Sequence, residues 1–183
     1  MRIISGIARG RRIDSPKGMD TRPTLDRVRE SVFGIIQFQV AGSTVLDLFA
    51  GSGAMGLEAL SRGAGYAIFN DRSRVCTDII QGNIKTLGFE ERARVYGLDF
   101  RGTIDVLAAA KQRVDIVFID PPYLSGLAQA AADLIFQSGI LTDTGIVVAE
   151  HSPKYDIVAP DCSVKRPTRI YGSVAVSIFE RGC

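Results

Sequence analysis

Short apolar runs alternate with segments of helical periodicity along most of the chain. The runs predict buried strands at 44–49, 66–70, 93–97, 114–119 and 145–150. Apolar residues spaced three or four apart predict helices at 54–62, 73–87, 103–111 and 128–136. Strands that alternate with helices in this way favour a doubly wound α/β fold around a mostly parallel sheet.

Both ends of the chain depart from this alternation. Residues 1–18 predict a short β-hairpin, and residues 163–171 and 173–181 predict an antiparallel hairpin at the edge of the sheet. The chain has 183 residues, of which 46% are apolar, enough for one domain with its own core plus a small appendage. We therefore divide it into a basic N-terminal arm, residues 1–23, and a main domain, residues 24–183.

Helical periodicity also predicts which side chains face the core. In a helix capped near Thr24, the inward face carries Leu25, Val28, Val32, Ile35 and Ile36. Four charged residues fall off that face and meet solvent, substrate or cofactor: Arg22, Arg27, Arg29 and Glu30. In the 73–87 helix, the predicted inward set is Val75, Ile79, Ile80, Ile84 and Leu87. From its position alone, Asn83 on that helix is an ordinary exposed polar residue.

The net charge of +2 does not by itself indicate a nucleic-acid partner, but the charge is unevenly distributed. Basic residues crowd the first 29 positions: Arg2, Arg9, Arg11, Arg12, Lys17, Arg22, Arg27 and Arg29. The only acids there are Asp14, Asp20 and Asp26. A basic end on a near-neutral body favours a phosphate-binding surface, with a solvated basic tail as the alternative. The candidate phosphate contacts are Arg9, Arg11, Arg12 and Arg22.

Composition narrows the class of protein. Three cysteines without metal-like spacing and a single histidine, His151, cannot form a zinc site of Cys and His, so we expect no metal. Unpaired cysteine usage is typical of a reducing compartment, which predicts a cytoplasmic protein. No apolar run approaches the ~20 residues of a membrane span, and no signal segment is apparent.

The strand at 114–119 runs directly into Asp120-Pro121-Pro122-Tyr123. Proline cannot continue the hydrogen-bond ladder, so these residues lie at the carboxyl end of a buried strand, where ligands bind in open α/β sheets. Asp120 and the Pro121 carbonyl can accept hydrogen bonds from a flat, NH-bearing base, and Tyr123 can stack on it. The alternative is a turn with a capping aspartate.

A glycine-rich loop follows the first predicted strand. Gly51, Gly53 and Gly56 fit the dinucleotide pattern G-x-G-x-x-G, although Asp47 stands within the strand and the loop has no basic residue. Asp71 ends the second strand and is placed for ribose hydroxyls, or it caps the next helix. Asp99 follows the third strand and can accept from an adenine amine, or cap a helix.

These pieces together resemble class I S-adenosylmethionine-dependent methyltransferases. Asp47–Gly53, DLFAGSG, is similar to their first cofactor motif, and DPPY resembles the motif of enzymes that methylate exocyclic amines. The resemblance implies a seven-stranded Rossmann-like sheet and a cofactor, S-adenosylmethionine, that leaves as S-adenosylhomocysteine. The implied cofactor-binding residues are Asp47, Phe49, Ala50, Gly51, Gly53, Asp71, Arg72, Leu98 and Asp99.

A narrower resemblance covers nearly the whole chain. RIISGIARGRRI, RPTLDRVRESVFGII, DLFAGSGAMGLEALSRGA and FIDPPY, in this order and spacing, resemble the RsmD family. Those enzymes methylate the N2 amine of one guanine in bacterial 16S ribosomal RNA. The resemblance implies that Asp120, Pro121, Pro122 and Tyr123 form the catalytic loop and that the substrate is 16S rRNA, either free or within a small ribosomal subunit. We expect a monomer.

This sequence differs from the family pattern at two positions, where Met55 replaces a usual Leu and Asp71 replaces a commoner Glu. Asn83 falls on a position that the family usually keeps.

Three other functions share part of this pattern. A DNA adenine N6-methyltransferase would use the same DPPY loop, but no inserted target-recognition domain is apparent in the 183 residues, and the basic arm is small for sequence reading. A nucleic-acid-binding module without catalysis would not need the intact set of acids and glycines, which consists of Asp47, Gly51, Gly53, Asp71 and Asp120. A nicotinamide oxidoreductase would explain the glycine pattern but not DPPY.

Overall fold

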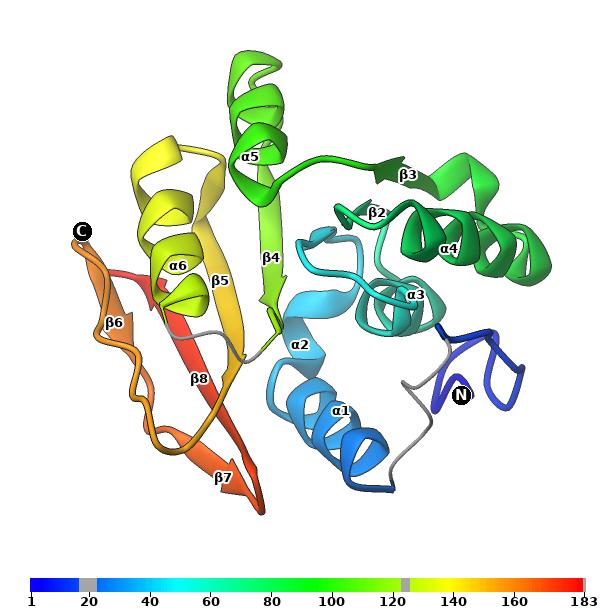
Figure 1. The fold of residues 1–183 in the computed structure, drawn as a ribbon, viewed down its shortest axis with the longest axis horizontal. Coiled ribbons are helices and arrows are strands. Elements are labelled where there is room, and N and C mark those ends of the chain that lie inside the picture. Colours follow the sequence, from blue (N-terminus) through cyan, green and yellow to red (C-terminus); the bar gives the residue numbers. More distant parts are fainter. Residues whose placement is uncertain (17–22, 123–125, 183) are drawn as a thin grey trace.

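The chain folds around one central sheet in a computed structural model that describes residues 1–16, 23–122 and 126–182, with only the backbone of 23–25 (Figure 1). The strands are β1 (Thr44–Asp47), β2 (Tyr66–Asn70), β3 (Ala93–Tyr96), β4 (Val114–Ile119), β5 (Leu141–His151), β6 (Ser163–Lys165), β7 (Arg169–Tyr171) and β8 (Val174–Arg181). The helices are α1 (Pro23–Ile35), α2 (Gln37–Val40), α3 (Ala54–Ser61), α4 (Arg74–Leu87), α5 (Phe100–Ala109) and α6 (Leu127–Ser138), with a 3₁₀ turn at Glu90–Arg92.

The strand order is β3-β2-β1-β4-β5-β8-β6, with β7 paired to β8 beside β6. The first five strands in this order are parallel, and β8 pairs with β5 in the antiparallel sense. Because β6 and β7 pair with opposite ends of β8, eight strands fill seven positions of the sheet. The doubly wound sheet and the C-terminal hairpin are confirmed, with the first predicted hairpin strand broken into two.

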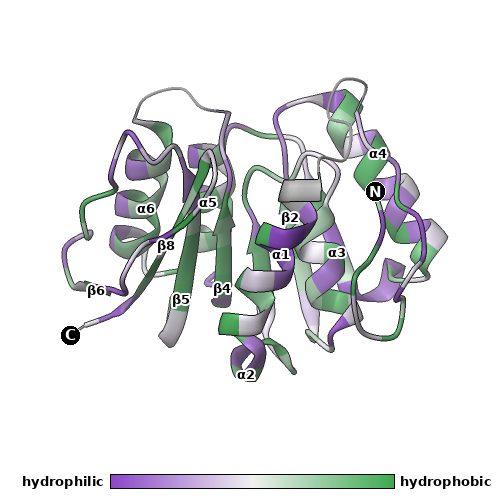
Figure 2. Cartoon of the chain, turned by 90° about the horizontal axis from the view of Figure 1, so that it is seen from below, coloured by the Kyte–Doolittle hydropathy of each residue, from purple (hydrophilic) through white to green (hydrophobic). Residues whose placement is uncertain are grey.

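Each face of the sheet is covered by its own layer of helices. Val45, Phe118 and Val148 pack with the N-terminal arm and with α1, α3 and α4. Leu46, Val117 and Ala149 point the other way and pack with α5 and α6. Figure 2 shows apolar strands in the middle of the molecule between helices that carry both polar and apolar turns. Burial on both faces explains why the central strands are continuous apolar runs.

The N-terminal arm forms only the outline of the predicted hairpin. A single antiparallel bridge joins Arg2 and Arg12, and the backbone N–H of Ile3 donates to the carbonyl of Arg11 at 3.0 Å. Residues 17–22, which include Arg22, lie outside the described residues. Ile3, Ala8 and Ile13 are buried in the core, so the arm is a packed part of the domain.

Three predicted environments are wrong. Val75 is 62% exposed because the buried stripe of α4 runs through Cys76, Ile80 and Ile84, one position to its side. Asn83 lies on that stripe and is 2% exposed, so it is not a surface residue. Arg29, expected off the core face, is 4% exposed because acidic partners accompany it into the interior.

Cys76 is a buried free thiol and Cys162 is disulfide-bonded. Within the described ranges, no helix is long and apolar enough to cross a bilayer.

Candidate active site

The carboxyl ends of four parallel strands bring the predicted site residues to one edge of the sheet. Asp47 is the last residue of β1, Asp71 follows β2, Asp99 lies just beyond β3, and Asp120 follows β4. The strand order reverses between β1 and β4, because β2 lies outside β1 and β5 lies outside β4. Such a switch point is where open α/β sheets bind ligands.

Two carboxylates set the shape of the glycine loop. Asp47 Oδ2 accepts a hydrogen bond from the backbone N–H of Gly56 at 3.0 Å, and Asp71 Oδ2 accepts from that of Gly51 at 2.9 Å. Gly51 and Gly53 have φ values of 55° and 79°, a region that L side chains rarely adopt. The loop is therefore held in one open turn at the end of β1.

The third glycine of the pattern has a packing role. A Cβ added to Gly56 would lie 2.3 Å from Cε1 of Phe69. Gly56 thus lets α3 pack closely on β2, which is the helix–sheet role that the third glycine has in this loop pattern.

Asp99 caps its helix as the alternative predicted, Asp71 does not because Ser73 is the N-cap of α4, and both carboxylates remain predicted cofactor contacts. Asp71 Oδ1 accepts from the backbone N–H of Ser73 at 2.9 Å, ahead of α4. Asp99 accepts from the backbone N–H of Arg101 at 3.0 Å and caps α5. Both carboxylates have further lone pairs for ligand hydroxyl or amine groups.

The other predicted cofactor residues frame the same edge. Phe49 packs on Phe100 with ring centroids 5.5 Å apart. Leu98 is 39% exposed, and Arg72 is exposed at the start of the turn into α4. The exposed leucine offers an apolar surface to a flat ligand at this edge.

Sequence reasoning missed Asn70, which ties the strand ends together. Its buried amide donates to the carbonyl of Leu48 at 3.1 Å. Its oxygen accepts from the backbone N–H of Leu98 at 3.2 Å and from Thr103 Oγ1 at 2.7 Å. An asparagine that ends a buried strand at a ligand-binding edge is the signal that could have identified it.

The catalytic loop begins where β4 stops. Pro121 is buried and Pro122 is exposed, and Tyr123 lies outside the described residues. Asp120 keeps an exposed surface, yet the protein around it displaces water, and this desolvation raises the pKa of its carboxyl to about 6. Burial, together with the charges of Asp120 and Asp71, raises the pKa of Asp47 to about 7.

The arm arginines differ in what they contact. The guanidinium groups of Arg9 and Arg12 are exposed, and neither bonds to a described residue. Arg11 instead donates to the carbonyls of Thr86 and Leu87, the last turn of α4. Arg11 therefore stabilises a helix end that cations favour.

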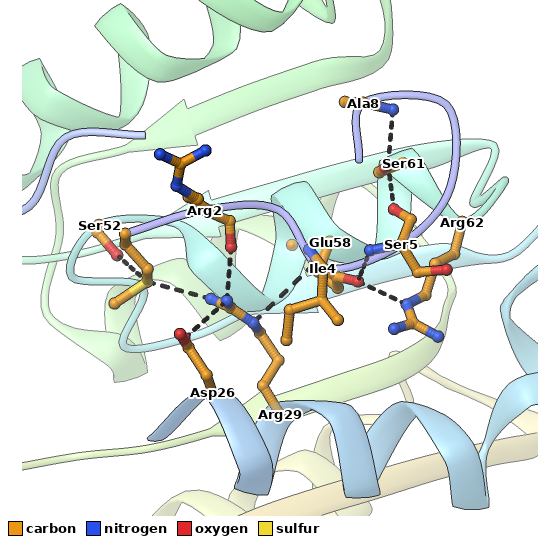
Figure 3. A network of polar contacts seen from close by, with 12 residues as sticks. Arg2, Ile4, Ser5, Ala8, Asp26, Arg29, Ser52, Glu58, Ser61 and Arg62 are labelled. Carbon is orange, nitrogen blue, oxygen red and sulfur yellow. Dashed lines mark hydrogen bonds and ion pairs between the residues drawn. The ribbon is translucent and has the colours of Figure 1, made fainter. Parts of the chain in front are cut away.

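A buried polar network holds the arm on the main domain (Figure 3). The carboxylate of Glu58, which is fully buried on α3, accepts from the backbone N–H of Ile4 at 2.8 Å and of Ser5 at 3.0 Å. It also pairs with Arg62 at 2.7 Å, while Arg29 donates to the Arg2 carbonyl at 2.7 Å. Residues of two distant segments thus satisfy each other's polar groups.

A cavity of about 500 Å³ opens between the arm and α1. It is lined by Met1, Arg2, Arg12, Ile13, Asp14, Ser15 and Asp26. Among the described residues, no cluster of His, Cys, Asp or Glu is arranged to hold a metal ion.

Comparison with known proteins shows the family. A family model described as "Conserved hypothetical protein 95" matches residues 1–180. Ribosomal RNA small subunit methyltransferase D of Escherichia coli (strain K12) is 34% identical, over 99% of this chain and 90% of that protein. The Bacillus subtilis (strain 168) protein YlbH is 37% identical over 99% of both chains. The solved structure of the E. coli protein yhhF matches with a TM-score of 0.84 and 33% identity, over 99% of this chain and 97% of that one. On this evidence, the chain belongs to the RsmD family.

Proposed function

We propose that this protein transfers a methyl group from S-adenosylmethionine to the exocyclic N2 of a guanine in 16S ribosomal RNA. Its relatives support the coarser statement, an S-adenosylmethionine-dependent methyltransferase that acts on ribosomal RNA. The observation that carries the finer proposal is the placement of Asp120 and Pro121 beside the glycine loop, across the switch point of the sheet.

The residues of the edge fit the cofactor. The open turn at Gly51 and Gly53 admits close approach of a ligand to the backbone, and Asp71 has lone pairs free for ribose hydroxyls. Asp99 and Leu98 would meet the adenine ring, with Phe49, Ala50, Arg72 and Asp47 around them. When bound, S-adenosylmethionine supplies an activated methyl group on a sulfonium.

Asp120 and the Pro121 carbonyl prepare the nucleophile. The N2 lone pair of guanine is delocalised into the ring, which makes the amine a weak nucleophile. Hydrogen bonds from the amine to Asp120 and to the Pro121 carbonyl would favour a tetrahedral nitrogen and stabilise the positive charge that develops on it. Tyr123 would stack on the base once it has left the RNA stack. Asp120 or water takes the amine proton.

The arm supplies the RNA surface. Arg9 and Arg12 present exposed guanidinium groups, unpaired among the described residues, which suit forked contacts to phosphate oxygens, and Arg11 and Arg22 extend the same basic segment. Because the arm is packed on α3, phosphate contacts there would fix the RNA relative to the catalytic loop. We propose that the protein acts as a monomer in the cytoplasm.

Methyl transfer from labelled S-adenosylmethionine tests the function. The substrates are small ribosomal subunits, free 16S RNA and duplex DNA, with nucleoside analysis of the product. N2-methylguanosine in the ribosomal RNA is the expected result, and the better of the two RNA forms identifies the substrate. N6-methyladenine in DNA would contradict the proposal and point to the alternative use of the same loop.

A further inference from the structure

Glu150 is a buried carboxyl to which the proposed function gives no role. It lies near the carboxyl end of β5 and is 8% exposed. No hydrogen bond or ion pair within 4.0 Å joins its carboxyl to a described residue. A largely buried carboxylate without such a partner is costly, which favours its protonated form or the approach of a cation.

Strand register places Glu150 beside the catalytic loop. Ile119 of β4 is paired with Ala149 of β5, so the next residues along the two parallel strands, Asp120 and Glu150, are neighbours. On the other side of β4, Phe118 is paired with Asp47 of β1. The three carboxyls therefore occupy adjacent strand ends at the switch point.

The alternation of side chains puts Glu150 and Asp47 on the same face. Val45 and Val148 belong to the core that packs under α1 and α3, and residues two positions further along each strand point the same way. Those residues are Asp47 and Glu150. Both carboxyls thus point to the side of the sheet that α1 covers.

Charges around Glu150 oppose its ionisation. Burial, followed by the charges of Asp120 and Asp47, raises the pKa of Glu150 to about 8. Arg29, on α1, is the cation that acts in the opposite direction. Its guanidinium is already paired with Asp26 at 3.0 Å and lies 3.9 Å from Glu58, so it neutralises Glu150 only in part.

We propose that Glu150 is the proton-releasing member of a cluster with Asp47 and Asp120 that recognises the positive charge of the sulfonium. The inference rests on the proposed function, because the reacting amine, the methyl carbon and the sulfur must lie in line. An amine held by Asp120 then requires the sulfonium within a few ångströms of this cluster. A cation there favours the ionised form of Glu150, and its proton passes to the buffer.

The consequence is discrimination between cofactor and product. S-adenosylhomocysteine has the same adenosine and amino-acid groups, but its sulfur is a neutral thioether. The neutral thioether does not favour ionisation of Glu150, and it places no positive charge beside the three carboxyls. By linkage, the affinity for S-adenosylmethionine relative to the product rises with pH while Glu150 is losing its proton. Glu150 is thus a specificity residue that favours release of the product.

Calorimetric titration of the full-length protein tests this directly. Each ligand is titrated at pH 7.5 in two buffers of different ionisation enthalpy, which gives the number of protons released on binding. We expect S-adenosylmethionine to release more protons than S-adenosylhomocysteine from the wild type, and this difference to shrink in Glu150→Gln to the part that Asp47 and Asp120 contribute. The matched control is Glu180→Gln on the neighbouring β8, where the glutamate pairs with Arg166 away from the cluster. It should keep the wild-type difference.

The outcomes separate the two proposals. Equal proton release by the two ligands from the wild type would overturn this inference, whether or not Glu150→Gln folds. An undiminished difference in a folded Glu150→Gln would also overturn it. If the wild type binds neither ligand, the proposed function itself fails and the inference fails with it. Between pH 7.5 and 8.5, above the pKa of Asp47, the ratio of the two dissociation constants should change with pH more steeply in the wild type than in Glu150→Gln.

Discussion

The side-chain amide of Asn83 bridges the carbonyls of Asp14 and Ser52, at 3.0 Å from each oxygen. Its own oxygen accepts from the backbone N–H of Asp14 at 2.8 Å. Asp14 belongs to the arm and Ser52 to the glycine loop, so one buried side chain on α4 fixes both segments. The family position of Asn83, which sequence alone could not explain, has a structural reason here.

Replacing this asparagine should loosen both segments. Asn83→Asp loses the two donated hydrogen bonds and places an oxygen against two carbonyl oxygens. We expect a loss of about 1–3 kcal/mol in the free energy of unfolding, measured by urea denaturation. Cofactor affinity should fall as well, because Ser52 loses its tether.

Ser61→Ala is the matched control for Asn83→Asp. Ser61 Oγ accepts from the backbone N–H of Ala8 at 3.0 Å and so also holds the arm, but it does not touch the glycine loop. It should cost stability while leaving cofactor affinity within about threefold, a ratio worth less than 1 kcal/mol. Equal loss of cofactor affinity in both variants would contradict the role given to Asn83.

Removing the carboxylate under the arm should be far more costly. Glu58→Ala leaves Arg29 buried with one acidic partner fewer and leaves the N–H groups of Ile4 and Ser5 unpaired. We expect about 3–5 kcal/mol of destabilisation and faster proteolysis within the arm. The control is Glu91→Ala, which replaces an exposed glutamate. If the arm of Glu58→Ala were cleaved no faster than the arm of Glu91→Ala, Glu58 would not hold the arm.

The arm arginines should separate into two kinds. Changing Arg9 and Arg12 together to Ala should weaken RNA binding and lower the slope of log affinity against log salt by up to about 2, since each phosphate contact contributes ~1. Arg11→Ala should instead cost about 1 kcal/mol of stability, because it caps α4. Filter binding across a salt series is the measurement. An unchanged slope in the double variant would contradict the phosphate role.

Asp120→Asn should separate catalysis from cofactor binding. Methyl transfer should fall by about 10²–10³, the usual cost of losing one group that stabilises developing charge, while cofactor affinity falls much less because Asp47 and Glu150 still face the sulfonium. Asp105→Asn, an exposed aspartate on α5, should leave both unchanged. Loss of cofactor binding in Asp120→Asn would make Asp120 a cofactor residue.

The apo protein should lose stability as the pH rises because of Glu150. Its pKa is about 8 in the folded protein against an ordinary value of 4.5, so between these values the folded state holds a proton that the unfolded state has lost. Stability then falls with rising pH, by up to about 1.4 kcal/mol per unit for this one group. Glu150→Gln should fall less steeply, because only the contributions of Asp47 and Asp120 remain, and denaturation from pH 5 to 8 measures the difference. Parallel curves would contradict the raised pKa.

Local patterns predicted the parts of the fold that local chemistry determines. The strands at 66–70 and 114–119 have the predicted bounds, because a run buried on both faces and ended by a polar residue or a proline leaves little choice. The glycine loop and the acids at the strand ends could be predicted because each follows directly after a predicted strand, and parallel strands end at the same edge of a sheet. The broken hairpin strand, with Pro167 in its gap, shows where alternation alone is insufficient.

The environments of Arg29, Asn83 and Glu150 could not be predicted in the same way. Arg29 can be buried because the fold brings Glu58, on another helix, close to its guanidinium. Asn83 can be buried because the fold brings Asp14, 69 positions away in the sequence, within hydrogen-bond distance. Glu150 was simply the end of an apolar strand until the register with β4 placed it beside Asp120. Such residues depend on partners brought together by the fold, which periodicity along one helix or strand does not report.

The two margins of the sheet bear on how molecules of this protein behave when concentrated. One margin is β3, four residues long, and the other is divided between β6 and β7, of three residues each. Pro167 interrupts the second margin and has no N–H to offer, and the exposed Arg169 places a positive charge beside it. Long flat margins are templates on which a second chain can add a strand and begin to aggregate. Short, charged and interrupted margins deny that template, so strand-to-strand association between copies is disfavoured by the same hairpin that completes the sheet.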